Sequence, residues 1–183
     1  MNLKQNIICL TVLLFALIYC SYSLASDDGI TWTGQAEGVA KDGIFKRTAT
    51  PSFSFQYPIG STKILTNSPL QIMRMKTPED VIFNASLAKI PDGMKLEEFG
   101  PKYLTSVLQQ FGSDVKVISN NKITLKCGAQ AYRTDISWLY GGSYPLTSVF
   151  VSAYKEGQCI WVAAHPMGSP EKFAPMVESL TLK

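Results

Sequence analysis

Hydrophobic and polar positions alternate over residues 132–138 with the period of two that is typical of half-buried β-strands, and residues 148–154 and 159–164 are rich in β-branched and aromatic side chains. This pattern predicts three consecutive strands, Ile123–Leu139, Pro145–Tyr154 and Cys159–His165. The segments that link them, 140–144 and 155–158, are too short to connect parallel strands. The pattern therefore predicts an antiparallel meander, around which the rest of the chain is arranged.

Shorter alternating runs predict further strands at 53–57, 70–75 and 81–87, and a hairpin of 115–118 with 122–125. Met73 and Met75 fall on one strand face, which favours core filling over soft-metal binding. Asn84 begins a glycosylation sequon, but the sequon lies inside a predicted strand.

The period changes after residue 93, where apolar side chains recur every three or four residues and predict an amphipathic helix over 95–111. Pro101 should bend this helix. Ser169 and Pro170 form an N-cap signal for a second, shorter helix. Strands, a long helix, more strands and a short helix predict class α+β, with an antiparallel β-sheet covered by helices.

The first 25 residues have the features of a signal peptide: Lys4, an apolar run over 7–20, and a small-x-small ending at Ala25. The apolar run is shorter than the roughly 20 residues that a membrane-spanning helix needs. We therefore expect cleavage after Ala25, export to the periplasm or outside, and no stable membrane span afterwards. Lipid attachment at Cys20 is the alternative, which the bulky Tyr19 before it disfavours.

The mature chain is expected to contain a flexible N-terminal arm over 26–50 and one domain over 51–183. Within it, Lys and Arg nearly balance Asp and Glu, and no basic run occurs. This balance gives no support for a nucleic acid partner. We expect a protein partner in the cell envelope, and the sequence makes no prediction of oligomeric state.

Cys127 and Cys159 are the two cysteines that remain after cleavage, and an oxidising compartment permits a structural bridge between them. An intervening strand would hold their Cα atoms too far apart unless the chain bends at the end of the sheet. The disulfide and two separately buried thiols are both open interpretations.

His165 is the only histidine in the chain. Catalysis by this imidazole would require a nucleophile and an orienting group, and no nucleophile-elbow motif is present. A zinc site needs three or four ligands, and one histidine with two cysteines does not supply a convincing set. No glycine-rich loop of the kind that binds phosphate precedes a predicted helix. The sequence therefore predicts no catalytic, metal or cofactor residue.

Tyr140 and Tyr144 flank a Gly-Gly turn and predict an aromatic tip, either exposed as an interface or packed on the adjacent helix. Together with His165 at a nearby strand end, they form the candidate binding surface. Arg133 and Asp135 share one strand face, which favours an ion pair over a binding surface.

The chain from about residue 50 to 183 resembles the PsbP/DcrB-like family. Three segments carry the resemblance: Phe53–Pro58, Ile90–Phe99 and Asn120–Tyr132, followed by the meander and 177–182. The resemblance implies an α/β/α sandwich around a central antiparallel sheet, and members that are exported and non-enzymatic where understood. Plant and cyanobacterial relatives are extrinsic subunits of photosystem II, a role for which this sequence shows no motif.

We therefore expect an exported, non-catalytic binding or assembly module. Two alternatives stay open: a small hydrolase-type enzyme that uses His165, and a purely structural or stress-related envelope protein.

Overall fold

The structure is a computed structural model that describes residues 38–41, 43–64 and 71–183, with the backbone alone for 38–41. The expected signal peptide and the first part of the expected arm, residues 1–37, lie outside the described residues. The described residues belong to one compact unit.

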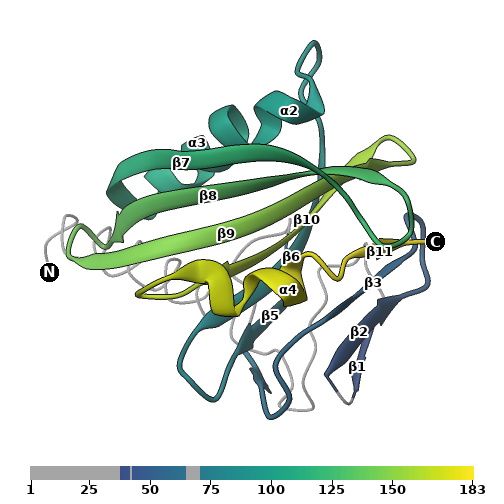
Figure 1. The fold of residues 1–183 in the computed structure, drawn as a ribbon, viewed down its shortest axis with the longest axis horizontal. Helices are drawn as coiled ribbons and strands as arrows, with labels where there is room; N and C mark the ends of the chain where they lie inside the picture. Colours follow the sequence, from purple (N-terminus) through teal and green to yellow (C-terminus); the bar gives the residue numbers. More distant parts are fainter. Residues whose placement is uncertain (1–37, 42, 65–70) are drawn as a thin grey trace, which may run out of the picture. The chain divides into compact units, whose positions relative to one another are not determined.

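Seven strands form the larger antiparallel sheet, in the order β4-β5-β6-β10-β9-β8-β7 (Figure 1). Their bounds are β4 Thr62–Lys63, β5 Gln71–Lys76, β6 Ile82–Lys89, β7 Gly112–Thr124, β8 Gln130–Tyr140, β9 Tyr144–Lys155 and β10 Gln158–His165. The central strands β6 and β10 are buried on both faces, which explains their nearly continuous apolar sequence. The predicted antiparallel meander is confirmed as β8, β9 and β10.

A second, four-stranded antiparallel sheet has the order β1-β2-β3-β11. Its strands are β1 Gly38–Lys41, β2 Ile44–Arg47, β3 Phe53–Gln56 and β11 Thr181–Leu182. Phe45 in β2 is fully buried, because it packs beside Phe55 at 5.1 Å between ring centroids. The folded unit therefore begins before residue 51, and the expected boundary between arm and domain is wrong for residues 38–50.

The helices cover the larger sheet (Figure 1). On one face lies a single continuous helical segment of α2 Leu96–Glu98, η1 Phe99–Leu104 and α3 Thr105–Gln109, as predicted for 95–111. After β10 the chain forms a 3₁₀ turn, η2 Pro170–Lys172, and α4 Ala174–Val177. The N-cap prediction for Ser169 is confirmed, since its side chain accepts a hydrogen bond from the Glu171 N–H.

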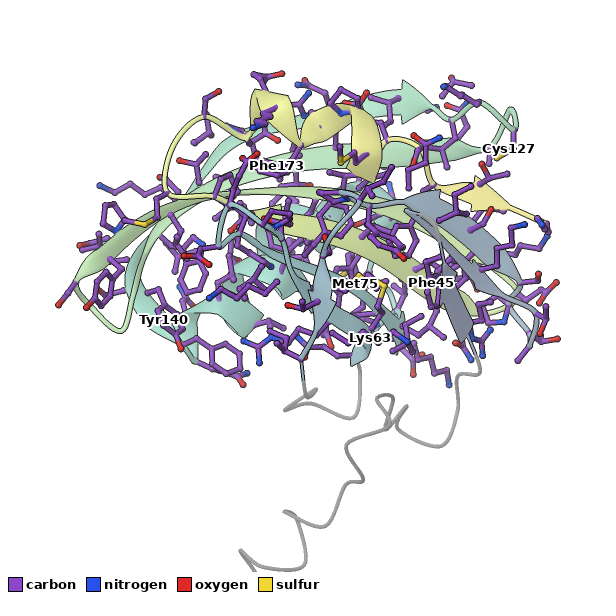
Figure 2. All side chains as sticks on the ribbon, turned by 90° about the horizontal axis from the view of Figure 1, so that it is seen from below. Phe45, Lys63, Met75, Cys127, Tyr140 and Phe173 are labelled. Carbon is purple, nitrogen blue, oxygen red and sulfur yellow. The ribbon has the colours of Figure 1, made fainter. Side chains whose placement is uncertain are left out.

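Two hydrophobic clusters result from this arrangement, one on each face of the larger sheet. The first joins that sheet to the smaller sheet and α4, and it contains Met73 and Met75, which confirms their core-filling role (Figure 2). The second lies beneath the long helical segment and contains Phe99, Leu104 and Trp161. The structure is thus α+β with an antiparallel sheet covered by helices, as the sequence predicted.

The predicted hairpin of 115–118 with 122–125 is wrong, because β7 is one strand of 13 residues along the edge of the sheet. Asn120 does not form a turn. Its side-chain amide donates to the Glu97 carbonyl at 2.7 Å and accepts from the Thr134 hydroxyl at 2.8 Å. Two register shifts against β8, at 113/116 and 117/119, accommodate the extra residues as bulges.

The predicted strand over 123–139 is interrupted at its start. Residues 125–128 form the turn between β7 and β8, in which the Gly128 N–H donates to the Leu125 carbonyl at 2.8 Å. The φ of Gly128 is 84°, a left-handed conformation that favours glycine. The strand β8 therefore begins only at Gln130.

Candidate functional site

His165 lies at the end of β10, and both of its ring nitrogens are within hydrogen-bond distance of side chains on neighbouring strands. Its Nδ1 is 2.7 Å from the Ser148 Oγ on β9, and its Nε2 is 2.7 Å from the Asn84 Oδ1 on β6. Ser148 also accepts a 2.7 Å hydrogen bond from the indole Nε1 of Trp138 on β8. We call these four residues, Asn84, Ser148, His165 and Trp138, the polar relay.

The two ends of the polar relay fix the direction of its hydrogen bonds. An indole N–H can only donate, and an amide oxygen can only accept. Ser148 therefore accepts from Trp138 and donates its own hydrogen to the Nδ1 of His165, whose Nε2–H donates to Asn84. All three hydrogen bonds, from Trp138 to Ser148, from Ser148 to His165 and from His165 to Asn84, therefore require a neutral imidazole that carries its hydrogen on Nε2.

Burial keeps His165 neutral. Removal from water lowers the pKa of its imidazole to about 4, and the nearby positive charge of Arg74 acts in the same direction. Two ring contacts enclose the imidazole: Phe150 at 5.5 Å and Trp138 at 6.3 Å, both edge-on. The relay is therefore a hydrogen-bonded polar group whose Asn84, Ser148 and Trp138 are buried and whose His165 is half-buried, next to the hydrophobic cluster beneath the helical segment.

The contact between Ser148 and His165 has the residue types of a nucleophile and a base, but the surroundings differ from a catalytic triad. Ser148 is 0% exposed, so its Oγ is not accessible to a substrate in this conformation. The group that orients the imidazole, Asn84, is a neutral amide and does not stabilise an imidazolium as a carboxylate would. A pKa near 4 also makes His165 a weak base at neutral pH.

Tyr140 and Tyr144 are exposed at the tip of the β8–β9 hairpin, where they are register partners. Figure 2 shows Tyr140 at this end of the sheet. Phe111 joins them, because the Gly141 N–H donates to the Phe111 carbonyl at 3.0 Å. Met167 follows β10 in the chain. The residue before it, Pro166, is bound to β9, because its carbonyl accepts a hydrogen bond from the Thr147 N–H at 2.9 Å.

We call these four side chains the aromatic apex, defined by Phe111, Tyr140, Tyr144 and Met167. Their exposed fractions are 51%, 49%, 62% and 70%, respectively. The sequence carries no Asp, Glu, Lys or Arg over 103–113, 136–149 or 157–170, the three segments that contribute them. The end of the hairpin therefore carries exposed, largely aromatic side chains on segments that contain no Asp, Glu, Lys or Arg.

Trp138 connects the aromatic apex to the polar relay. Its ring lies edge-on to Tyr140, with 5.8 Å between centroids and an interplanar angle of 88°. The same indole donates to Ser148, which binds His165. The three residues predicted as a binding surface thus differ in exposure: Tyr140 and Tyr144 are exposed and His165 is half-buried. The Trp138 ring contacts both Tyr140 and His165.

Arg133 on β8 is the centre of a charged cluster on the opposite face of the sheet. It binds Asp135 through two nitrogens, at 3.1 and 3.0 Å, and it contacts Glu171 at 2.7 Å and Glu178 at 3.1 Å. The hydrogen bonds to Asp135 raise the pKa of the guanidinium the most. The predicted ion pair is confirmed, and the two glutamates extend it to η2 and to the end of α4.

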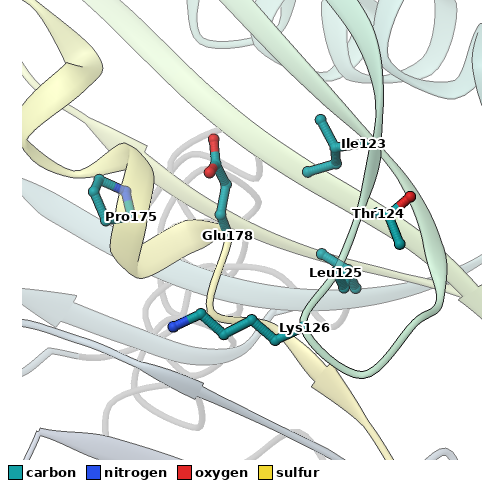
Figure 3. A pocket seen from close by; sticks show the side chains of 6 residues that line it. All are labelled: Ile123, Thr124, Leu125, Lys126, Pro175 and Glu178. Atoms are coloured by element: carbon teal, nitrogen blue, oxygen red, sulfur yellow. The ribbon is translucent and has the colours of Figure 1, made fainter.

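A hollow of about 220 Å³ lies beside this cluster (Figure 3). It is lined by Ile123, Thr124, Leu125, Lys126, Pro175 and Glu178. Its volume is below the range of about 300–1,000 Å³ that is usual for small-molecule sites. Its two charged side chains, Lys126 and Glu178, have opposite signs, so the hollow favours neither anions nor cations.

Of the two interpretations left open for Cys127 and Cys159, the disulfide does not occur in the structure, where both cysteines are free thiols. Cys127 is exposed in the β7–β8 turn, whereas Cys159 is buried in β10 beneath the helical segment. Because β9 separates β10 from β8, two strand spacings of about 4.8 Å already exceed the roughly 7 Å limit for a disulfide. Burial raises the pKa of the Cys159 thiol.

The sequon at Asn84 is also constrained by the fold. Asn84 is buried in the central strand β6, its oxygen binds His165, and its nitrogen contacts the Ser86 Oγ at 3.4 Å. A glycan on this side chain is incompatible with these contacts in the folded chain.

Sequence reasoning missed the partners of His165 and two members of the apex. Asn84 and Ser148 lie 81 and 17 residues from His165 along the chain, and only strand pairing brings them together. Asn84 and Ser148 are each a polar residue inside a largely apolar strand, and this was the sequence signal that could have indicated a buried hydrogen-bond partner. Phe111 was assigned to the apolar face of the helix, but it follows the last helical turn and is exposed.

Within residues 38–41, 43–64 and 71–183, no group of three or more His, Cys, Asp or Glu side chains is arranged to hold a metal ion. No helix in these segments is both long and apolar enough to cross a membrane.

Two solved structures provide the comparison with known proteins. The cyanobacterial PsbP (CyanoP) from Synechocystis sp. PCC 6803 superposes with a TM-score of 0.58 at 14% sequence identity, over 87% of this chain and 97% of that one. A protein of unknown function from Pseudomonas aeruginosa, PA94, gives a TM-score of 0.41 at 12% identity, over 77% and 88% of the two chains. No family model and no curated protein matches the sequence. The comparison with CyanoP shows that this chain has a PsbP-like fold.

Proposed function

We propose that this chain is an exported, non-catalytic binding or assembly module that docks onto a protein of the cell envelope through the aromatic apex. The observation that carries the proposal is the exposure of Phe111, Tyr140, Tyr144 and Met167 at one end of the sheet, on segments without charged residues. The PsbP-like fold supports grouping the chain with exported PsbP/DcrB-like proteins.

The composition of the apex supports a protein partner. Tyr, Phe and Met are enriched at the centres of protein interfaces, and charged residues other than Arg are depleted there. A fully buried aromatic side chain removes about 150–250 Å² from water, so four half-exposed side chains offer roughly 400 Å². This is about half of the 800 Å² that one partner contributes to a standard interface, so the apex is suited to be its centre.

The proposal of a non-catalytic role is supported by the polar relay. Its serine is fully buried, its imidazole has a lowered pKa, and its orienting group is an uncharged amide. Turnover of any substrate that disappears in a Ser148→Ala variant would overturn this part of the proposal and favour the hydrolase alternative.

Export is proposed from the sequence of the first 25 residues, with cleavage after Ala25. The envelope is therefore the place in which a partner should be sought.

The test is photo-crosslinking in the native envelope with a photoreactive phenylalanine analogue placed at position 144. Position 154 is the matched control, because Tyr154 lies on the same strand β9 near its opposite end and is 52% exposed. We expect a discrete protein adduct from position 144 that position 154 does not give. The double variant Tyr140→Ser/Tyr144→Ser should lower recovery of the same partner while leaving the circular dichroism spectrum unchanged.

Equal adducts from both positions would contradict docking through the apex. Adducts with lipid alone would replace the protein partner by a membrane surface, and they too would contradict the proposal as stated.

A further inference from the structure

We propose that Trp138, Ser148 and His165 are positioning residues for the aromatic apex: the polar relay holds the indole ring in the orientation against which Tyr140 packs. This inference rests on the proposed function, because it explains how the contact surface named there is held in place. None of the three residues is itself required to touch a partner.

The geometry fixes the indole at two points. Its Nε1–H donates to the Ser148 Oγ at 2.7 Å, and its ring meets the His165 ring edge-on at 6.3 Å. Trp138 is only 6% exposed, whereas Tyr140, whose ring lies edge-on to the indole at 5.8 Å, is half exposed. The exposed tyrosine therefore rests on a buried ring that a chain of hydrogen bonds holds in one orientation.

The chain of hydrogen bonds extends from the apex to the centre of the sheet. Trp138 is on β8, Ser148 on β9, His165 on β10 and Asn84 on β6, which are four successive strands of the larger sheet. Asn84 is 4% exposed, so the last acceptor of the relay belongs to the core. A rotation of the indole would break the hydrogen bond between the Trp138 N–H and the Ser148 oxygen. Both groups are buried, so the rotation would cost the free energy of that hydrogen bond.

Ser152 shows that this arrangement is not a general property of buried serines on this face. It follows Ser148 by four residues on β9, so both side chains point to the same side of the sheet. Both serines are 0% exposed, but the Ser152 Oγ has no hydrogen-bond partner within the described part of the chain. Ser152→Ala is therefore a matched control for Ser148→Ala.

A side chain such as Tyr140 that is held in one orientation before binding favours complex formation. A contact residue that is already in its bound orientation loses less conformational freedom when the complex forms. Rigid aromatic side chains are effective in interfaces for this reason. The relay would give Tyr140 that property although it lies on an exposed hairpin.

The test is nuclear magnetic resonance of the full mature chain with ¹⁵N-labelled tryptophan. In the unaltered protein, the Trp138 indole N–H should exchange slowly with solvent, and the Tyr140 ring protons should show the shift that an edge-on indole causes. In Ser148→Ala, exchange of this N–H should be about tenfold faster or more, which is the effect of one lost hydrogen bond. The Tyr140 signals should also move towards their values in an unfolded peptide, and Ser152→Ala should change neither.

A second pair of variants keeps the test independent of the folding of Ser148→Ala. His165→Phe keeps an aromatic ring but offers no acceptor to Ser148, whereas His165→Asn provides an amide oxygen near the position of Nδ1. We expect the Tyr140 signals to move in His165→Phe and to stay closer to the wild type in His165→Asn.

Equal Trp138 exchange and equal Tyr140 shifts in Ser148→Ala and Ser152→Ala would overturn the inference, and so would a Trp138 N–H that exchanges freely in the unaltered protein. These readouts need no partner. If position 144 gives no protein adduct while the resonance results are as expected, the proposed function fails and the positioning role of the relay stands.

Discussion

Gly100 is the residue at which the helical segment comes closest to the sheet. A Cβ atom on this residue would lie 2.0 Å from the Thr134 Oγ1 and 2.8 Å from the Thr134 Cβ. Thr134 has no space to retreat, because it is fully buried and its hydroxyl donates to Asn120. The absence of a side chain at position 100 is therefore a condition for the packing of the helix on β8.

We expect Gly100→Ala to lower the free energy of unfolding by about 1–3 kcal/mol, the range for overpacking a filled core. The better helix propensity of alanine, worth about 1 kcal/mol, offsets only part of the clash. Urea denaturation measures the difference. The control is Gly168→Ala, where a Cβ meets no atom within 4 Å and where we expect a change within about 0.5 kcal/mol. Equal stability of the two variants would show that helix and sheet separate easily at this point.

At the scale of elements, the long helix owes its irregular middle to Pro101. Proline has no N–H, so the Glu97 carbonyl lacks the donor that an α-helix would supply four residues later. The helix widens to the π-type turn Phe99–Leu104, and the Asn120 side chain on β7 donates to that same carbonyl at 2.7 Å. A strand residue thus stabilises the defect that the proline creates in the helix.

This link predicts a coupling between two distant residues. Asn120→Ala should cost about 1–3 kcal/mol of unfolding free energy, because it removes the hydrogen bond to the Glu97 carbonyl and leaves the buried Thr134 hydroxyl without its acceptor. The cost should fall in a Pro101→Ala background, where residue 101 regains an N–H. Denaturant unfolding of the two single variants and the double variant gives the coupling energy.

Asn121→Ala is the matched control, since Asn121 is the neighbouring residue and is exposed. A loss of stability there as large as at Asn120 would argue that the strand, and not the helix contact, is the source of the effect. Strictly additive costs for Asn120→Ala and Pro101→Ala would remove the proposed link between them.

At the scale of the whole molecule, the half-buried His165 of the polar relay makes stability depend on pH. The folded protein holds His165 neutral with a pKa of about 4, whereas an unfolded chain binds a proton near pH 6.5. Between these values the unfolded state carries more protons, so stability falls as the pH is lowered from about 6.5 to about 4. The loss is on the order of 3 kcal/mol, and none is expected from this residue above pH 6.5.

Because His165 is the only histidine in the chain, a single variant isolates this effect. His165→Asn should show a flatter profile of unfolding free energy between pH 6.5 and 4, measured by urea denaturation at each pH. Carboxylates titrate in both proteins, so the difference between the two profiles reports the imidazole. Parallel profiles would mean that the folded protein accommodates a charged His165.

Much of the fold could be predicted from local patterns. The β-branched and aromatic side chains of Pro145–Tyr154 and Cys159–His165, and the period near 3.6 in 95–111, follow from which residues must be buried, and the observed elements agree within a few residues. Asn120 was misassigned as a turn residue because its role depends on Glu97 and Thr134, which lie 23 and 14 residues away. Local propensity carries no information about such partners.

The sequence alone determined the class, the antiparallel meander, the position of the helix and the tyrosine pair at the hairpin turn, because burial and turn chemistry act over a few neighbouring residues, whereas the exposure of that pair is known only from the structure. Only the tertiary structure decided what His165 contacts, that Cys127 and Cys159 stay apart, and that Phe111 and Met167 complete the apex. Those outcomes depend on strand order, which places β6 beside β10 and inserts β9 between β10 and β8. Strand order is set by the packing of whole faces, and no short stretch of sequence specifies it.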